Sequence, residues 1–117
     1  MYQYTAKIID VYDGDTVTAD IDLGFGVVMQ SQKLRLLGVN APELKGDSKP
    51  QGITSRDWLI GKILGRDVLI CTHKDKHTEI DKHDSFGRWL AEIFVDGESV
   101  NQQLVTLGLA APFMVGN

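Results

Sequence analysis

The sequence has one cysteine, no long apolar run and no excess of positive charge, and each shortage excludes a class of protein. Cys71 stands alone among 117 residues, so neither an intrachain disulfide nor a cysteine zinc site can form. Its apolar setting, Val68 to Ile70, predicts a small buried side chain. No apolar stretch reaches the about 18 residues of a membrane-spanning helix. No signal peptide pattern follows Met1, so we expect a cytoplasmic protein without membrane partners, or a secreted one if an export segment was removed.

The charge balance is acidic. The 12 lysines and arginines are outnumbered by 16 aspartates and glutamates, which gives a net charge of −4. This balance argues against sequence-independent wrapping of nucleic acid over a broad basic surface. It permits an enzyme that directs a few arginines and a bound cation at one phosphate. His73, His77 and His83 are scattered through a charged loop without ligand spacing, so no zinc or other metal site is expected there.

Alternating apolar and polar residues predict the strands. The alternation is regular over residues 2–8 and 17–23, and a less regular strand is expected over 27–37. Short buried strands are expected at 68–72 and 90–95. Turn signals separate the first strands at Asp13-Gly14 and at Gly24 to Gly26.

Two helices are predicted from their end signals. Each begins at a serine with a glutamine three residues later, which is capping-box spacing, and each ends at a glycine. These residues are Ser48, Gln51 and Gly65 for the first helix and Ser99, Gln102 and Gly108 for the second. The order βββαββα predicts a mainly β fold with α-helices, a five-stranded OB-fold barrel, in a single domain spanning residues 1–117.

Four charged residues stand in distinctive local frames: Asp15, Arg35, Glu43 and Arg88. Each has a structural interpretation, since Asp15 lies in a turn, Glu43 can be a surface acid and Arg88 can form an ion pair. Arg35 lies among apolar neighbours and must either extend its charge to solvent or find an anionic partner, in the protein or in a ligand. Together, two carboxylates and two guanidiniums can hold a cation, act on water and bind a phosphate.

The order of three motifs resembles the staphylococcal nuclease (thermonuclease-like) family. The motifs are Asp13-Gly14-Asp15-Thr16-Val17, the arginine strand that ends in Pro42-Glu43, and Asp84-Ser85-Phe86-Gly87-Arg88. The resemblance runs from about Ile8 to Ala110, with a shortened C-terminus. It implies a calcium-dependent endonuclease that hydrolyses phosphodiester bonds of DNA and RNA and leaves 3′-phosphate ends. Single-stranded nucleic acid is the favoured partner, and the sequence predicts no oligomeric state.

The resemblance implies one Ca²⁺ site formed by Asp15, Asn40 and the backbone carbonyl of Ala41. Asn40 departs from the family, which commonly has a second metal-ligating aspartate at this position. An amide oxygen can still ligate calcium, but one full negative charge is missing. We therefore expect a weakened rather than an abolished metal site.

The resemblance also implies the catalytic and substrate-binding residues. Glu43 would activate or orient the attacking water, while Arg35 and Arg88 would bind the phosphate and stabilise the transition state. Phe86 replaces a tyrosine that contacts a terminal phosphate in the best-studied members, and keeps only the aromatic body. Phe113 can either stack a base or fill the core.

The sequence also supports an alternative function. Asn40, the acidic balance and the short C-terminus favour a catalytically weak or inactive OB-fold module that binds nucleic acid or protein. A third interpretation is a nuclease that needs a partner chain to complete its substrate groove.

Overall fold

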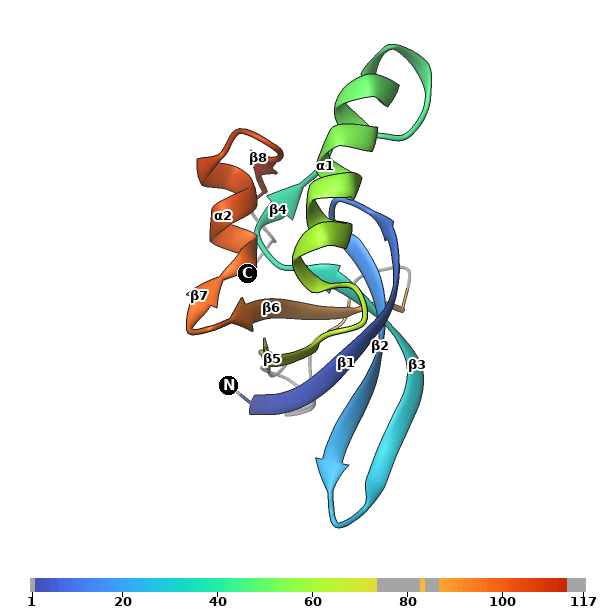
Figure 1. Ribbon diagram of the computed structural model, residues 1–117, viewed down its shortest axis with the longest axis vertical. Coiled ribbons are helices and arrows are strands. Elements are labelled where there is room, and N and C mark those ends of the chain that lie inside the picture. Colours follow the sequence, from blue (N-terminus) through green and yellow to red (C-terminus); the bar gives the residue numbers. More distant parts are fainter. Residues whose placement is uncertain (1, 74–82, 84–86, 114–117) are drawn as a thin grey trace.

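A closed barrel of long strands forms the centre of the protein, seen here in a computed structural model that describes residues 2–73, 83 and 87–113 (Figure 1). Its strands are β1 (Tyr2–Asp13), β2 (Thr16–Gly24), β3 (Val27–Leu36), β5 (Asp67–Thr72) and β6 (Trp89–Val95). They pair in the order β3-β2-β1-β5-β6, and a parallel pairing of β3 with β6 closes the barrel. The predicted OB-type barrel with two helices is confirmed.

The predicted alternation places apolar side chains inside the barrel. Ala6 and Ile8 of β1 and Val17 and Ala19 of β2 are all buried. β1 is longer than the sequence suggested, because an irregularity between Ile8 and Asp10 lets it bend and keep pairing with β2 as far as Asp13. The extended strand carries Asp13 to the turn that also holds Asp15.

The helix α1 (Lys49–Ile63) begins where predicted, but the predicted capping box at Ser48 is wrong. The Ser48 side chain accepts no capping hydrogen bond; its hydroxyl donates instead to the carbonyls of Glu43 (3.1 Å) and Lys45 (3.2 Å). A one-turn 3₁₀ helix, η1 (Gly46–Ser48), precedes α1 and puts Ser48 in a helical conformation that does not suit a cap. Ser48 therefore fixes the backbone after Pro42 rather than the helix start.

The helix α2 (Val100–Thr106) is capped as predicted. The Ser99 hydroxyl accepts a hydrogen bond from the Gln102 amide at 3.1 Å, and Gly108 follows the helix with a φ of 73°. Asn101 of α2 is buried and bonded on every side. Its side chain accepts from the Ile93 amide (3.0 Å) and donates to the carbonyls of Leu37 (2.8 Å) and Ala91 (3.1 Å). One side chain thus ties α2 to β6 and to the end of β3.

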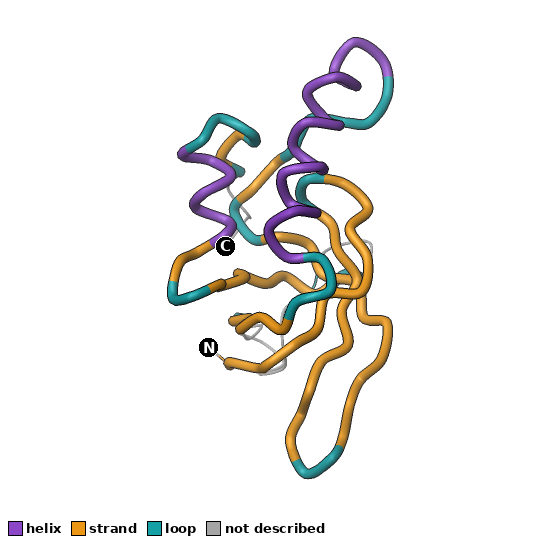
Figure 2. Tube along the Cα trace, viewed as in Figure 1, coloured by secondary structure: helices purple, strands orange, loops and turns teal. Residues whose placement is uncertain are grey.

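Short strands complete the fold. β4 (Val39–Asn40) pairs with β8 (Ala111–Pro112), and β7 (Glu98–Ser99) pairs with β6. Figure 1 shows β4 between the two helices, with the β2–β3 hairpin projecting from the opposite end of the barrel. Figure 2 shows the turn that joins β3 to β4 on the helix side. Within the described ranges, no helix is long and apolar enough to cross a membrane.

Candidate functional site

Asp15 is the centre of the candidate site. It is only 7% exposed and lies in the turn between β1 and β2, directly before Thr16, the first residue of β2. One carboxylate oxygen, Oδ2, accepts from the Ala41 amide at 2.8 Å and lies 3.3 Å from Arg35 Nη1. The other, Oδ1, accepts from the Thr16 hydroxyl at 3.1 Å. The β1–β2 turn and the segment after β4 are therefore joined through one carboxylate.

Arg35 has found the anionic partner that its apolar strand requires. Its side chain is 12% exposed, and Nη1 donates to the Val39 carbonyl at 2.6 Å besides pairing with Asp15. All its hydrogen bonds within the described ranges come from Nη1, so Nε and Nη2 have no protein partner there. Asp15 and Val39 hold one edge of the guanidinium, which leaves the other donors for a ligand.

Arg88 reaches the same carboxylate through Thr16. Arg88 Nη1 donates to the Thr16 hydroxyl at 3.2 Å, and that hydroxyl donates in turn to Asp15. Both arginines are thus connected to Asp15, one directly and one through a buried threonine. Thr16 was not predicted as a site residue; its position beside Asp15 in the first motif was the available signal.

Asp13 places a second acid in the turn. Its Oδ1 accepts a hydrogen bond from the Asp15 amide at 3.1 Å. Burial, and next a side-chain hydrogen bond with Asp15 and the negative charge of that carboxylate, raise the pKa of Asp13 from 3.8 to about 6, whereas the bond from the Asp15 amide lowers it. The turn therefore carries more negative charge than its surroundings easily hold.

Asn40 and Glu43 flank the cluster, and within the described residues their side chains make no hydrogen bond or ion pair with it. Asn40 is exposed on β4, next to Ala41, whose amide binds Asp15. The Glu43 side chain is exposed as well, but its backbone is held firmly. Ser48 donates to the Glu43 carbonyl, and a Cβ on Gly52 of α1 would lie 2.5 Å from that oxygen. The Glu43 backbone is thus fixed by α1, while its carboxylate faces solvent.

Two aromatic residues, Phe86 and Phe113, were predicted to bind substrate, and the structure describes only the second. Phe86 lies outside the described residues. Phe113 is 47% exposed, which excludes the alternative that it fills the core and leaves base stacking as a prediction. Its ring centroid lies 5.6 Å from the guanidinium carbon of Arg35, a cation–π distance, and its amide donates to the Gly38 carbonyl at 2.9 Å. The pairing of β8 with β4 brings the chain after α2 back to Arg35.

Ser55 of α1 is a buried residue of the candidate site that no sequence motif marks. It is 0% exposed, and its hydroxyl has no hydrogen-bond partner among the described residues. A Cβ on Gly14 would collide with this hydroxyl and would lie 2.8 Å from the Ala41 Cβ. Gly14 is required here because the turn, Ala41 and Ser55 meet without room for a side chain. A buried hydroxyl without a hydrogen bond costs about 1–3 kcal/mol of stability, so a serine at this position requires an explanation.

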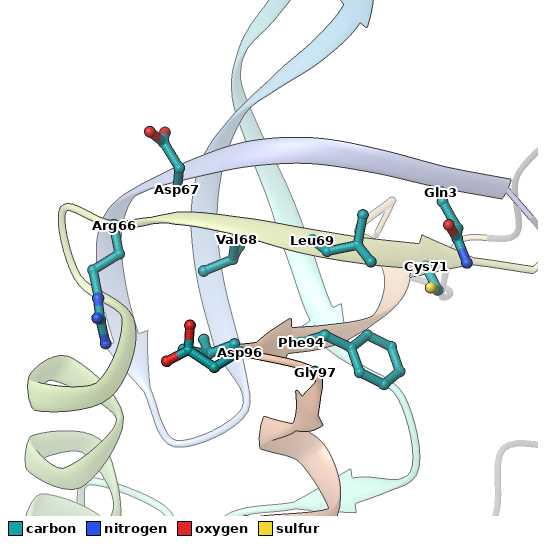
Figure 3. A pocket seen from close by; sticks show the side chains of 10 residues that line it. Gln3, Arg66, Asp67, Val68, Leu69, Cys71, Phe94, Asp96 and Gly97 are labelled. Carbon is teal, nitrogen blue, oxygen red and sulfur yellow. The ribbon is translucent and has the colours of Figure 1, made fainter.

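A separate depression of about 400 Å³ lies beside β5 and β6 and holds none of these residues (Figure 3). Phe94 and Cys71 lie at one end of it and Arg66 and Asp96 at the other. Cys71 is 4% exposed, which confirms the predicted buried thiol. This depression does not contribute to the candidate site, because Asp15, Arg35 and Arg88 do not line it.

Comparison with known proteins agrees with the fold and the motifs. The family described as "Staphylococcal nuclease homologue" matches residues 33–116, and the chain belongs to this family. It is 32% identical to the thermonuclease of Staphylococcus hyicus over 92% of this chain and 59% of that protein. It is also 25% identical to an uncharacterized protein of Methanocaldococcus jannaschii, over 95% of this chain and 60% of that protein. The chain therefore spans about three fifths of the length of the curated relatives it matches.

Proposed function

We propose that the chain is a metal-dependent, calcium-type endonuclease that hydrolyses phosphodiester bonds of DNA and, as a second substrate, of RNA. The observation that carries the proposal is the connection of two arginines to one buried carboxylate, Asp15. Arginine pairs bind phosphate oxygens through forked donors, and a carboxylate beside them can hold a cation next to the same phosphate. Family membership supports the same chemistry.

The residues at the turn fit a hard cation. Within the described residues there is no group of three or more histidine, cysteine, aspartate or glutamate side chains suited to a metal, so the proposed ligands include an amide and a backbone oxygen. Asp15, Asn40 and the Ala41 carbonyl would hold one Ca²⁺, since carbonyl and carboxylate oxygens are the ligands calcium takes. A carboxylate has about four acceptor sites. Among the described residues, Ala41, Arg35 and Thr16 take three of the Asp15 sites, and the Asp13 carboxyl lies close enough to compete with a cation for the fourth.

Arg35 and Arg88 would act on the phosphate. The Nε and Nη2 donors of Arg35, which have no hydrogen-bond partner among the described residues, would bind a non-bridging oxygen. Arg88 would stabilise the charge that develops as water attacks phosphorus. Glu43 would orient this water and take its proton, since its exposed carboxylate is free of protein partners in the described chain. A bound calcium ion would supply Lewis-acid stabilisation of the same oxygens. The bond between phosphorus and the leaving oxygen would then break, and that oxygen would take a proton from solvent to leave as an alcohol.

Phe113 supports a single-stranded substrate. Its ring is half exposed and lies beside Arg35, where a phosphate would bind. Unpaired bases stack on exposed aromatic rings, whereas bases in a duplex are already stacked. We therefore propose that the nucleotide next to the bound phosphate stacks on Phe113.

A second candidate function is a binding module without catalysis. The direct ion pair of Asp15 and Arg35 favours it, because such a pair stabilises the fold without a ligand. The amide of Asn40, in place of a second acid, favours it too.

One assay separates the two functions. Purified protein is incubated with single-stranded DNA, duplex DNA or RNA, in calcium or chelator, beside Glu43→Ala and the matched control Asp47→Ala, an exposed acid nearby. Calcium-dependent cleavage by the wild type and by Asp47→Ala, lost in Glu43→Ala, supports the nuclease. Absence of cleavage at millimolar calcium would reject catalysis by this chain, and binding of labelled DNA would then support the module.

A further inference from the structure

The buried hydroxyl of Ser55 is the clearest unmet interaction in the described part of the molecule. Ser55 lies on the buried face of α1, in line with Gly52, Leu59 and Ile63. Serine hydroxyls within helices often bond back to the preceding turn, as the exposed Thr54 does to the Pro50 carbonyl at 3.0 Å. The Ser55 hydroxyl makes no such bond within the described residues.

The surroundings of this hydroxyl make alanine the more stable choice for the structure as it stands. It is in contact with Gly14 and close to the Ala41 side chain, and no polar side chain among the described residues bonds to it. Alanine would keep the packing and remove the unmade hydrogen bond. A buried polar group of this kind calls for a functional explanation.

The position of Ser55 identifies what it can act on. The Asp13–Asp15 turn and Ala41 are hydrogen-bonded to each other through Asp15. Gly14 of this turn lies so close to Ser55 and to Ala41 that a Cβ on it would collide with both. These are the segments proposed to supply cation ligands. Any adjustment of the turn that brings Asp15 and the Ala41 carbonyl onto a cation moves backbone groups that Ser55 touches.

We propose that Ser55 is a positioning residue for the cation site, whose hydroxyl completes its missing hydrogen bond on the Asp13–Asp15 turn or the Ala41 segment when a divalent cation binds. The inference rests on the proposed function for the cation. It assigns to α1 a role in cation affinity through a residue that touches neither the cation nor the substrate.

The test measures calcium-induced stabilisation without any substrate. Melting temperatures of wild type, Ser55→Ala and Thr54→Ala are recorded in chelator and over a calcium titration, and calcium affinity is measured by calorimetry. Thr54→Ala is the matched control, because it removes an exposed hydroxyl from the neighbouring position of the same helix.

We expect Ser55→Ala to melt at or above the wild-type temperature in chelator. Its melting temperature should rise less than that of the wild type when calcium is added. One hydrogen bond predicts calcium affinity weaker by about 2- to 10-fold. Thr54→Ala should keep the wild-type calcium response. Ser55→Cys, which is close in size but a weak donor, should follow Ser55→Ala.

Two results would overturn the inference, and they are distinguishable. An equal calcium response in wild type and Ser55→Ala rejects the role of Ser55 and leaves the cation site standing. No calcium response in the wild type rejects the cation site itself, and the role of Ser55 with it.

Discussion

The two helices flank β4 (Figure 1), and each brings one buried polar side chain to the barrel. The two side chains differ in whether their hydrogen bonds are made. Asn101 of α2 makes three hydrogen bonds, to Ile93, Leu37 and Ala91. Ser55 of α1 makes none among the described residues. A complete buried network stabilises one packing, whereas an incomplete one costs stability. The contact of α2 with the barrel through Asn101, called the α2 junction, therefore favours stability. The contact of α1 with the barrel through Ser55, called the α1 junction, does not.

The difference follows the position of the charged residues. The α1 junction holds the Asp13–Asp15 turn, with a raised Asp13 pKa, and fixes the Glu43 backbone through Gly52. Natural proteins depart from the most stable arrangement mainly at functional sites. We therefore expect substitutions at the site to change chemistry and cation response, and substitutions at the α2 junction to change stability.

Arg88→Ala tests the expectation that substitutions among the charged residues change the chemistry, and it should have the largest effect on the cleavage rate. Removing one preorganised donor to the transition state should lower kcat by about 10²- to 10³-fold, equivalent to about 2.7–4 kcal/mol. Single-turnover cleavage of labelled DNA in calcium measures the loss. Arg66→Ala, an exposed arginine beside β5, is the matched control and should retain full activity. Equal rates for Arg88→Ala and wild type would remove Arg88 from the mechanism.

Asn101→Ala tests the stability side. It removes three hydrogen bonds and leaves the Ile93 amide and the Leu37 carbonyl without this partner, while the Ala91 carbonyl still accepts from the Leu37 amide. The free energy of unfolding should therefore fall by about 3 kcal/mol and Tm by about 10–20 °C. Urea and thermal denaturation measure both. Gln102→Ala, the next residue on the same helix and exposed, should shift Tm by only a few degrees. A small effect of Asn101→Ala would mean that the two junctions do not differ in the way proposed.

Asn40→Asp should sharpen the contrast at the α1 junction. A second carboxylate adds negative charge beside Asp15, which should tighten calcium binding about 10-fold, equivalent to about 1.4 kcal/mol, and leave the chelated protein no more stable. Calorimetric titration with calcium measures the change. Gln30→Glu, which adds the same charge on an exposed part of β3, should leave calcium affinity unchanged. Unchanged affinity in Asn40→Asp would place the cation away from Asn40.

The sequence predicted the barrel because its signals are local. Alternation marked the strands, and the serine and glycine end signals marked α2 correctly. The same capping signal failed at Ser48, because the Glu43 and Lys45 carbonyls compete for its hydroxyl. A serine before a helix looks the same in sequence whether its side chain caps the helix or hydrogen-bonds to the carbonyls of the preceding loop.

The site was predictable only where charge marks it. Asp15, Arg35 and Arg88 stand out in their motifs, and the structure connects them. Thr16 and Ser55 carry no charge and depend on contacts between distant segments, Thr16 with Arg88 and Ser55 with Gly14. A single sequence reveals no such contacts, and the exposed position of Phe113 depends likewise on the pairing of β8 with β4.

Asp13→Asn should have the smallest effect and tests whether the turn is strained by charge. The pKa of Asp13 is about 6 in the folded protein against an ordinary value of 3.8, so its contribution favours folding below pH 3.8 and is lost as pH rises through 6. Asparagine keeps the oxygen that accepts from the Asp15 amide and carries no charge. In chelator, Asp13→Asn should therefore match wild type near pH 4 and exceed it above pH 6, by about 1 kcal/mol or less because Asp13 is partly exposed. Asp22→Asn is the matched control, since Asp22 makes the same bond to the Gly24 amide in an exposed turn. Melting curves from pH 4 to 8 measure the difference, and a gain that does not vary with pH would show that charge is not what strains this turn.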